Sequence, residues 1–285
     1  MKIFPPDFTI AALAPAGPVS EELVNGGAEA LRKLGAKVKL MPHIHSASSP
    51  HRFLAAGDQE RSADLTAAWH DPEVSMIWAI RGGYGCARLL ESLNWHELAQ
   101  RRIPAGGFSD ITALHWAMTA KNCGIAMALP MFSFLMDADE FTLRELARNF
   151  TDSDIPHYTL PALRKGDICA LPLPGNLTVA ATLCGTPYFP DTTGRVIILE
   201  EVGEASPYRI DRLLNQLYLA GTFQRAAGVV FGYFTNCGDN DSLMAVLDDF
   251  AAKVNIPVFY GMKYGHEQPF VSIRCDRPVR ITNAD

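Results

Sequence analysis

Several features that would point to particular classes of protein are missing from this sequence. None of its six cysteines forms a C-x-x-C pair, so the sequence indicates reduced thiols rather than a zinc site. Lys and Arg number 25 against 31 Asp and Glu, and the net charge of -6 provides no basic surface for nucleic acid or an anionic membrane. No apolar run is long enough to span a bilayer.

The start of the sequence also lacks the apolar core of a signal peptide. Pro5, Pro6 and Asp7 interrupt the only stretch that could form one, so we expect the protein to be cytoplasmic. The remaining composition, 48% hydrophobic and 20% charged over 285 residues, is typical of a globular protein with one large or two medium domains.

The order of the expected elements predicts an α/β fold. A strand over 8–13, a helix beginning near Ser20 and a strand over 37–40 form a β-α-β unit, which favours a parallel sheet with crossover helices. A further helix is expected over 58–70, before Asp71-Pro72, and about five strand–helix units in all follow one another, enough for a doubly wound domain. Ligands bind such sheets at the carboxyl ends of the strands.

The second half of the chain is expected to form a separate domain. Residues 151–166 lack hydrophobic periodicity and contain Pro156 and Pro161, so we place a linker there. This divides the chain into an N-terminal domain over 1–150 and a C-terminal domain over 167–285.

Two loops carry metal-binding residue types without a complete ligand pattern. His43, His45 and His51 share one loop, with no carboxylate or cysteine cluster close in sequence. Asp239-Asn240-Asp241 resembles a calcium loop but lacks the later glycine and glutamate, so we interpret it as a turn. We therefore expect no metal and no other cofactor.

A glycine-rich turn over 81–85 joins a predicted strand over 74–80 to a predicted helix. Exposed N–H groups of such a turn can hold an anion, either as a phosphate cradle or as half of an oxyanion hole. Alternatively, the turn needs glycine only for its backbone conformation. Its spacing fits neither a P-loop nor the Gly-x-Gly-x-x-Gly fingerprint.

The stretch over 106–112, Gly-Gly-Phe-Ser-Asp-Ile-Thr, is the main candidate for a reactive centre. A serine on a sharp strand-to-helix turn has an exposed hydroxyl beside free N–H groups, which can hold an oxyanion. The pattern departs from a Gly-x-Ser-x-Gly elbow because Ile111 replaces the second glycine, and a simple helix cap at Ser109 or Asp110 is the alternative. Because this turn and the 81–85 turn both follow strands, their convergence favours the functional interpretation.

An acid and a histidine later in the chain are further candidates. Glu200 and Glu201 lie at the end of an apolar strand predicted over 195–202. A buried acid there is costly unless it is paired, and a solvated strand terminus is the alternative. His266 follows Gly265 in a predicted loop, where it is free to project or simply to pack.

Together these segments resemble the LD-carboxypeptidases, serine peptidases that trim murein tetrapeptides. The matching segments follow the family order along nearly the whole chain: Ala14-Pro15, Gly57-Asp58, Glu60-Arg61, Asp64-Leu65, Arg81 to Gly85, Gly107 to Thr112, Gly175-Asn176-Leu177, Leu199-Glu200-Glu201, Tyr208 to Arg212 and Gly265-His266. One departure is Pro174, where the family often has another glycine.

The resemblance implies a class I amidotransferase-like, doubly wound N-terminal domain and a smaller C-terminal α/β domain. It implies a triad in the cleft between them, with Ser109 as nucleophile, His266 as general base and Glu200 orienting the imidazole. This chemistry suits the residues, because a serine hydroxyl needs a neutral imidazole to take its proton. Glu200 is preferred over Glu201 by family alignment, and alternation along a strand lets only one of them face the site.

The resemblance also suggests which groups hold the substrate. The N–H groups of Gly83 and Asp110 are candidates for the oxyanion hole, and Arg81, Tyr84 and Asn176 for substrate binding. The expected activity is hydrolysis of the terminal D-Ala from cytoplasmic murein tetrapeptides, at an L,D-bond, by a homodimer in peptidoglycan recycling. The alternatives are a microcin-type self-immunity peptidase that cleaves peptidyl or aminoacyl nucleotides, and a non-catalytic protein that binds an anionic ligand at 81–85.

Overall fold

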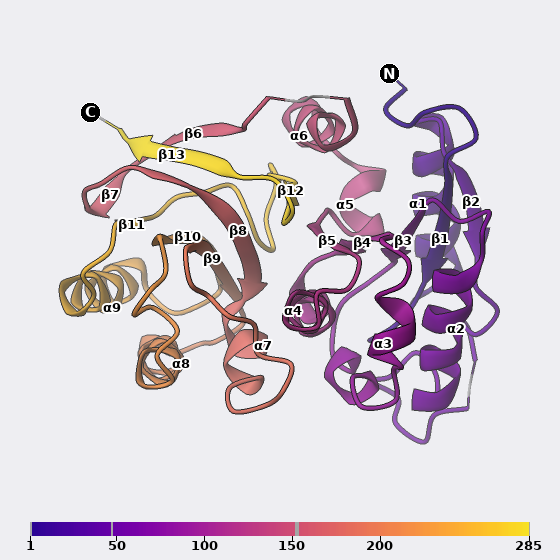
Figure 1. Ribbon diagram of the computed structural model, residues 1–285, viewed down its shortest axis with the longest axis horizontal. Helices are drawn as coiled ribbons and strands as arrows, with labels where there is room; N and C mark the ends of the chain where they lie inside the picture. Colours follow the sequence, from indigo (N-terminus) through magenta and orange to yellow (C-terminus); the bar gives the residue numbers. More distant parts are fainter. Residues whose placement is uncertain (1, 47, 152–153, 285) are drawn as a thin grey trace.

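The computed structural model describes residues 2–46, 48–151 and 154–284, which form two α/β domains, each built on one sheet (Figure 1). The first sheet has the strand order β12-β5-β4-β3-β1-β2. Its parallel strands are β1 (Thr9–Leu13), β2 (Lys37–Leu40), β3 (Met76–Ala79), β4 (Pro104–Gly107) and β5 (Ile125–Ala128). The edge strand β12 (Ile273–Arg274) runs antiparallel to β5 and comes from the far end of the chain.

Helices cover both faces of this sheet, so the predicted doubly wound arrangement is confirmed. Successive residues of β1 enter different cores: Ile10 and Ala12 join one, Ala11 and Leu13 the other. The first core includes side chains of α1 (Glu21–Lys33), α5 (Phe132–Met136) and α6 (Glu140–Thr151). The second includes side chains of α2 (Asp58–His70), α3 (Trp95–Leu98) and α4 (Thr112–Ala120).

The second sheet has the order β6-β13-β8-β9-β10-β11-β7. Four parallel strands form its centre: β8 (Ile168–Asn176), β9 (Arg195–Val202), β10 (Gly228–Thr235) and β11 (Val258–Phe259). The outer strands are β6 (His157–Leu160), β7 (Ala162–Arg164) and β13 (Val279–Asn283), and the helices are α7 (Leu177–Thr182), α8 (Pro207–Leu219) and α9 (Asn240–Lys253).

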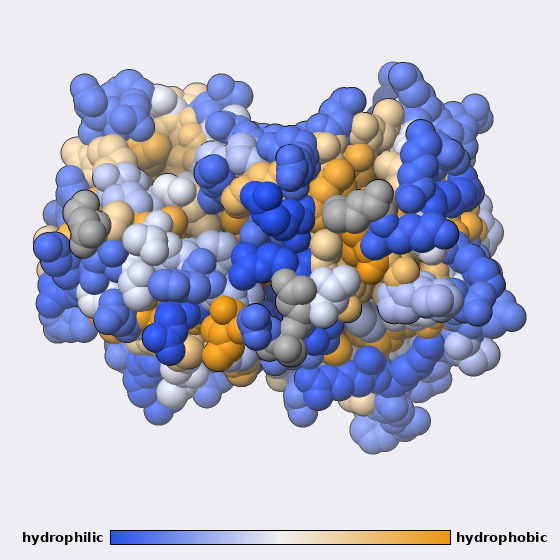
Figure 2. All heavy atoms as spheres, turned by 90° about the horizontal axis from the view of Figure 1, so that it is seen from above, coloured by the Kyte–Doolittle hydropathy of each residue, from blue (hydrophilic) through white to orange (hydrophobic). Residues whose placement is uncertain are grey.

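The two domains share one continuous apolar core around α4. Trp116 on α4 donates its indole N–H to the Pro174 carbonyl oxygen at 3.0 Å, and the Thr112 hydroxyl accepts the Asn176 N–H at 2.8 Å. Pro174 does not disturb β8, whose pairing with β9 continues to Asn176. The missing proline N–H is tolerated because the pairing of β8 with β13 ends at Ala170. Figure 2 shows the outline of the molecule indented between the two domains.

Some local predictions were wrong. Strands β6 and β7 lie within 151–166, where we expected an irregular linker, although residues 152–153 are outside the described part. The helix expected after Gly85 is only a 3₁₀ turn, Cys86–Leu89. The turn expected at Asp239 is the N-cap of α9, with the Asp239 carboxylate accepting the Ser242 N–H at 2.8 Å. Across the described residues, no helix combines the length and apolar character needed to cross a bilayer.

Candidate active site

Ser109 lies where β4 turns into α4 through a short 3₁₀ turn, Ser109–Ile111. Its φ of 61° is in the left-handed region, which non-glycine residues rarely adopt. Gly107, with a φ of 146°, allows the backbone to turn sharply from β4 and to pack against Ile111. A Cβ at position 107 would lie only 2.9 Å from Ile111 Cγ1. The turn leaves Ser109 partly exposed, so its hydroxyl is accessible at the carboxyl end of the sheet.

His266 lies between this hydroxyl and a buried carboxylate. Its Nε2 is 3.0 Å from Ser109 Oγ, and its Nδ1 is 2.6 Å from Glu200 Oε2. The imidazole packs on the Phe108 ring at a centroid distance of 4.9 Å. Gly265 supplies the backbone for this placement, since its φ is 135° and a Cβ would lie 3.0 Å from Glu200 Cβ. Three residues widely separated in the sequence therefore form one hydrogen-bonded series.

The carboxylate of Glu200 is fully buried at the end of β9. Burial raises its pKa, while the hydrogen bond with His266 opposes that rise by favouring the charged form. Its Oε1 has no hydrogen-bond partner among the described residues. A buried carboxylate in this position is suited to hold one imidazole tautomer and to balance positive charge on the ring.

Glu201 points away from His266 and organises the start of α7 instead. Its carboxylate accepts the Asn176 side-chain amide at 2.8 Å and the Thr178 N–H at 2.7 Å. Asn176 was a candidate for substrate binding, but it is only 4% exposed, and its Oδ1 caps α7 by accepting the Val179 N–H at 3.1 Å. Both the amide nitrogen and the amide oxygen of the Asn176 side chain therefore form hydrogen bonds within the protein.

The glycine-rich turn over 81–85 packs directly against Ser109. A Cβ on Gly82 would lie 3.0 Å from Ser109 Cβ and 3.4 Å from the Asp110 nitrogen. Gly83 follows with a φ of 109°. The carboxylate of Asp110 accepts the Cys86 N–H at 2.8 Å and ties the two turns together, and its burial raises its pKa. The backbones of the two oxyanion candidates, Gly83 and Asp110, are thus brought to one place.

Arg61 stabilises this arrangement, and sequence reasoning gave it no role. Although its guanidinium is charged, Arg61 is only 2% exposed. It donates hydrogen bonds to the carbonyl oxygens of Pro15, Gly85 and Ala56 and forms an ion pair with Asp58. It therefore joins the first βα loop to the glycine-rich turn. The signals in the sequence were a charged residue within the helical stretch over 58–70 and the Glu60-Arg61 pair of the family resemblance.

The other two substrate-binding candidates lie at the surface. Arg81 is exposed and donates from Nη1 to the Pro18 carbonyl oxygen at 2.7 Å. Tyr84 is 51% exposed and contacts the Phe53 ring edge-on at 5.8 Å, while Phe53 stacks on His51 at 5.0 Å. Both aromatic side chains are thus about half exposed beside the 81–85 turn.

Of the histidines that could suggest a metal, His43 contacts a carboxylate and His51 stacks on Phe53. His43 Nδ1 lies 2.7 Å from Asp64 Oδ1, and the same carboxylate accepts the His43 N–H at 3.0 Å. Throughout residues 2–46, 48–151 and 154–284, no three or more His, Cys, Asp or Glu side chains form a group that could hold a metal ion.

Comparison with known proteins identifies relatives of the whole chain. The sequence profile of the LD-carboxypeptidase N-terminal domain matches residues 10–129, and that of the LD-carboxypeptidase C-terminal domain matches residues 172–281. The murein tetrapeptide carboxypeptidase of Pseudomonas aeruginosa is 28% identical, over 92% of this chain and 89% of its own. The crystal structure of muramoyltetrapeptide carboxypeptidase from Oxalobacter formigenes is 29% identical with a TM-score of 0.83, covering 94% of this chain and 92% of that one.

A more distant solved structure has the same fold. The microcin C7 self-immunity protein MccF, in complex with aspartyl sulfamoyl adenosine, has a TM-score of 0.82 at 18% identity and covers 99% of this chain and 98% of its own.

Proposed function

This chain belongs to the LD-carboxypeptidase family, and on that premise we propose that it is a serine peptidase that removes the terminal D-Ala from murein tetrapeptides. The family and its carboxypeptidase activity come from the two matching profiles and from relatives named for murein peptides. The serine mechanism, the L,D-bond and the role in peptidoglycan recycling are the parts that we propose.

The observation that carries the mechanism is the series Ser109–His266–Glu200, with contacts of 3.0 and 2.6 Å. In the proposed reaction Ser109 Oγ attacks the carbonyl carbon before the terminal D-Ala, and its proton passes to His266 Nε2. Glu200 holds the Nδ1–H tautomer and stabilises the imidazolium. The imidazolium then protonates the leaving amine, which releases D-Ala and leaves an acyl group on Ser109.

Water completes the proposed cycle in a second half-reaction. His266 takes a proton from the water as it attacks the acyl carbon, and returns the proton to Ser109 Oγ as the ester bond breaks. In both half-reactions negative charge develops on the carbonyl oxygen. The N–H groups of Gly83 and Asp110 are the proposed donors to that oxygen, because the packing of Gly82 on Ser109 holds both turns beside the nucleophile.

The test is to incubate the purified protein with murein tetrapeptide and to follow free D-Ala by chromatography. Ser109→Ala is the matched control, and it should release no D-Ala above the background rate. An aminoacyl sulfamoyl nucleotide in a parallel reaction tests the self-immunity alternative, which the fold shared with MccF keeps open. Binding of the tetrapeptide without D-Ala release would contradict the peptidase proposal and favour the non-catalytic alternative. The cytoplasmic location and the homodimer remain predictions.

A further inference from the structure

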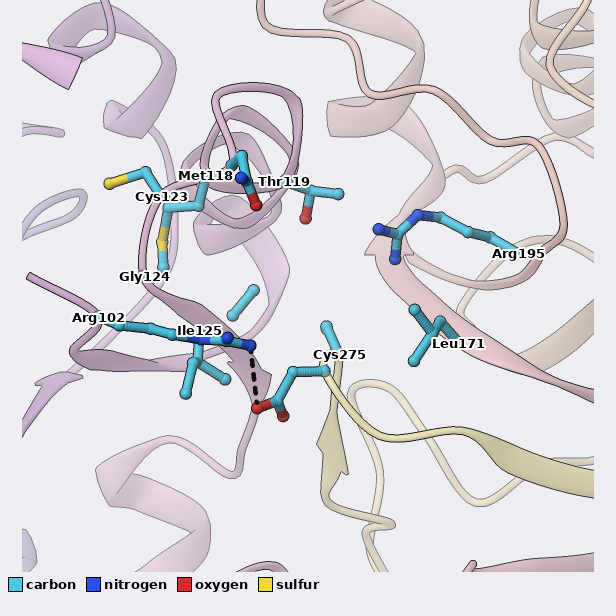
Figure 3. Close-up of a pocket in the computed structure, with 12 residues that line it drawn as sticks. Arg102, Met118, Thr119, Cys123, Gly124, Ile125, Leu171, Arg195 and Cys275 are labelled. Atoms are coloured by element: carbon cyan, nitrogen blue, oxygen red, sulfur yellow. Dashed lines mark ion pairs between the residues drawn. The ribbon is translucent and has the colours of Figure 1, made fainter. Parts of the chain in front are cut away.

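A second hollow lies between the two domains, away from Ser109. Its volume is about 210 Å³. The side chains around it come from both domains: Arg102, Met118, Thr119, Asn122, Cys123, Ile125, Leu171, Arg195, Cys275 and Asp276. Figure 3 shows Arg195 and Leu171 projecting from the second domain toward Met118 and Thr119 on α4. None of these residues belongs to the proposed mechanism.

The hollow and the candidate active site lie at opposite ends of the same elements. Ser109 follows the carboxyl end of β4, whereas Arg102 precedes the start of that strand. Likewise, Thr112 begins α4 near Ser109, whereas Met118 and Thr119 lie in its last turn. A helix of nine residues is about 13 Å long, so this hollow is not an extension of the catalytic cleft.

Arg195 is the unusual residue of this hollow. Among the described residues, its Nη1 is buried without a hydrogen-bond partner, and no carboxylate lies within ion-pair distance of its guanidinium. The carboxylate of Asp191 interacts with the Arg195 charge only at longer range and accepts hydrogen bonds from Thr193 instead. A buried donor without a partner destabilises the fold, and a charged one does so more strongly.

Asp276, the one acid among the described residues that line the hollow, cannot neutralise Arg195. Asp276 is bound by Arg274 through two hydrogen bonds of 2.9 and 3.0 Å, and Arg102 lies 3.6 Å from it. The dashed line in Figure 3 marks the contact with Arg102. Two arginines therefore face the hollow while its one carboxylate is already paired, which leaves a local excess of positive charge.

We propose that this hollow binds a small oxyanion, held by the Arg195 guanidinium. A planar guanidinium donates two parallel hydrogen bonds to a carboxylate, phosphate or sulfate group, and burial strengthens such bonds. The volume equals that of about seven water molecules, enough for inorganic phosphate or a small carboxylate. Because Arg195 belongs to one domain and Thr119 and Asn122 to the other, the bound anion bridges the domains and stabilises the folded chain.

The test is the thermal unfolding midpoint in rising concentrations of inorganic phosphate, and separately of citrate, against sodium chloride at equal ionic strength. We expect a saturable rise of the midpoint with at least one of the two anions. Arg195→Gln should weaken the apparent affinity by about tenfold or more, since it removes a charged donor. Arg225→Gln is the matched control, because Arg225 is exposed beside the start of β9, where its carbonyl oxygen accepts the Gly194 N–H, and it does not line the hollow.

A second control separates this site from the catalytic cleft. Arg81→Gln should keep the stabilisation by anions, because Arg81 belongs to the turn beside Ser109. A stabilisation that persists in Arg195→Gln, or that disappears in Arg81→Gln, would place the anion elsewhere and overturn the proposal. The absence of any saturable rise would show that the hollow holds only water.

One further measurement does not depend on any variant. Crystals grown with selenate in place of sulfate or phosphate should give an anomalous selenium peak in the hollow, with a selenate oxygen within hydrogen-bond distance of Arg195 Nη1. Failure to find that peak would contradict the proposal. Neither experiment depends on peptidase activity, so a result that contradicts the anion site leaves the proposed function unaffected, and the reverse also holds.

Discussion

His115 should make the stability of this protein unusually sensitive to mild acid. It lies on α4, is only 2% exposed, and donates from Nε2 to the Ala105 carbonyl oxygen of β4 at 3.0 Å. Burial lowers its pKa from 6.5 to about 4, because the imidazolium would lose its hydration inside the core. The neutral histidine therefore stabilises the strand that carries Ser109, whereas the protonated form would not.

The size of the effect follows from the two pKa values. In the unfolded chain His115 binds a proton below about pH 6.5, and in the folded chain only below about pH 4. The contribution of neutral His115 to the free energy of unfolding is fully present above about pH 6.5 and is lost as the pH falls toward 4. The full loss is about 3 kcal/mol, of which about 2 kcal/mol has occurred by pH 5.

The assay is urea unfolding of the wild type and of His115→Gln, followed by tryptophan fluorescence at pH 7.5 and at pH 5.0. Glutamine keeps a donor for the Ala105 carbonyl but does not titrate. The wild type should therefore lose about 2 kcal/mol more than the variant between the two pH values. His96→Gln, at an exposed histidine, controls for loss of an imidazole from the surface. A difference between wild type and His115→Gln that is the same at both pH values would refute the reasoning.

Four other outcomes concern the catalytic site. Ser109→Ala and His266→Ala should each lower kcat for D-Ala release by about a thousandfold or more with an unchanged circular dichroism spectrum, and near wild-type turnover would exclude the serine mechanism. Glu200→Gln should lower kcat by about a hundredfold or more, because the imidazolium that forms in the reaction loses its negative neighbour; an unchanged kcat would mean that another group balances that charge. Arg61→Met should lower kcat more than it raises KM and should lower the unfolding midpoint, with partial recovery in Arg61→Lys; unchanged kinetics would show that the 81–85 turn holds its position without Arg61. Activity should survive EDTA, and a loss restored by a divalent cation would reveal a metal site that the sequence pattern did not indicate.

The sequence predicted well those elements whose signals are local. The bounds of α2 and β9 in the structure are the ones predicted, 58–70 and 195–202. The sequence around α2 explains why: the helix begins after Gly57 and is stopped by Asp71-Pro72, and both signals lie beside it. The meeting of Ser109 with the 81–85 turn was also predictable, because both follow strands of one parallel sheet.

Elements whose partners lie far along the chain were not predictable in the same way. Strands β6 and β13 pair with each other across more than a hundred residues, and a short alternating stretch such as Val279–Asn283 does not show which distant strand it will join. The roles of Arg61 and Glu201 were missed for a related reason. Their main partners are backbone carbonyl and N–H groups, whose positions exist only once the loops are folded. The catalytic roles within the site stay predictions until variants are measured.

The position of β12 bears on how this protein is made. Residues 273–274 complete an edge of the sheet whose other strands lie between residues 9 and 128. His266 reaches Ser109 only when the same terminal segment is in place. During synthesis the N-terminal domain therefore emerges with β5 as an open edge and with Ser109 still separated from His266, its proposed base. A truncated chain that ends before residue 266 is thus expected to be inert toward peptides and to associate through β5, because it lacks both His266 and the strand that covers this edge.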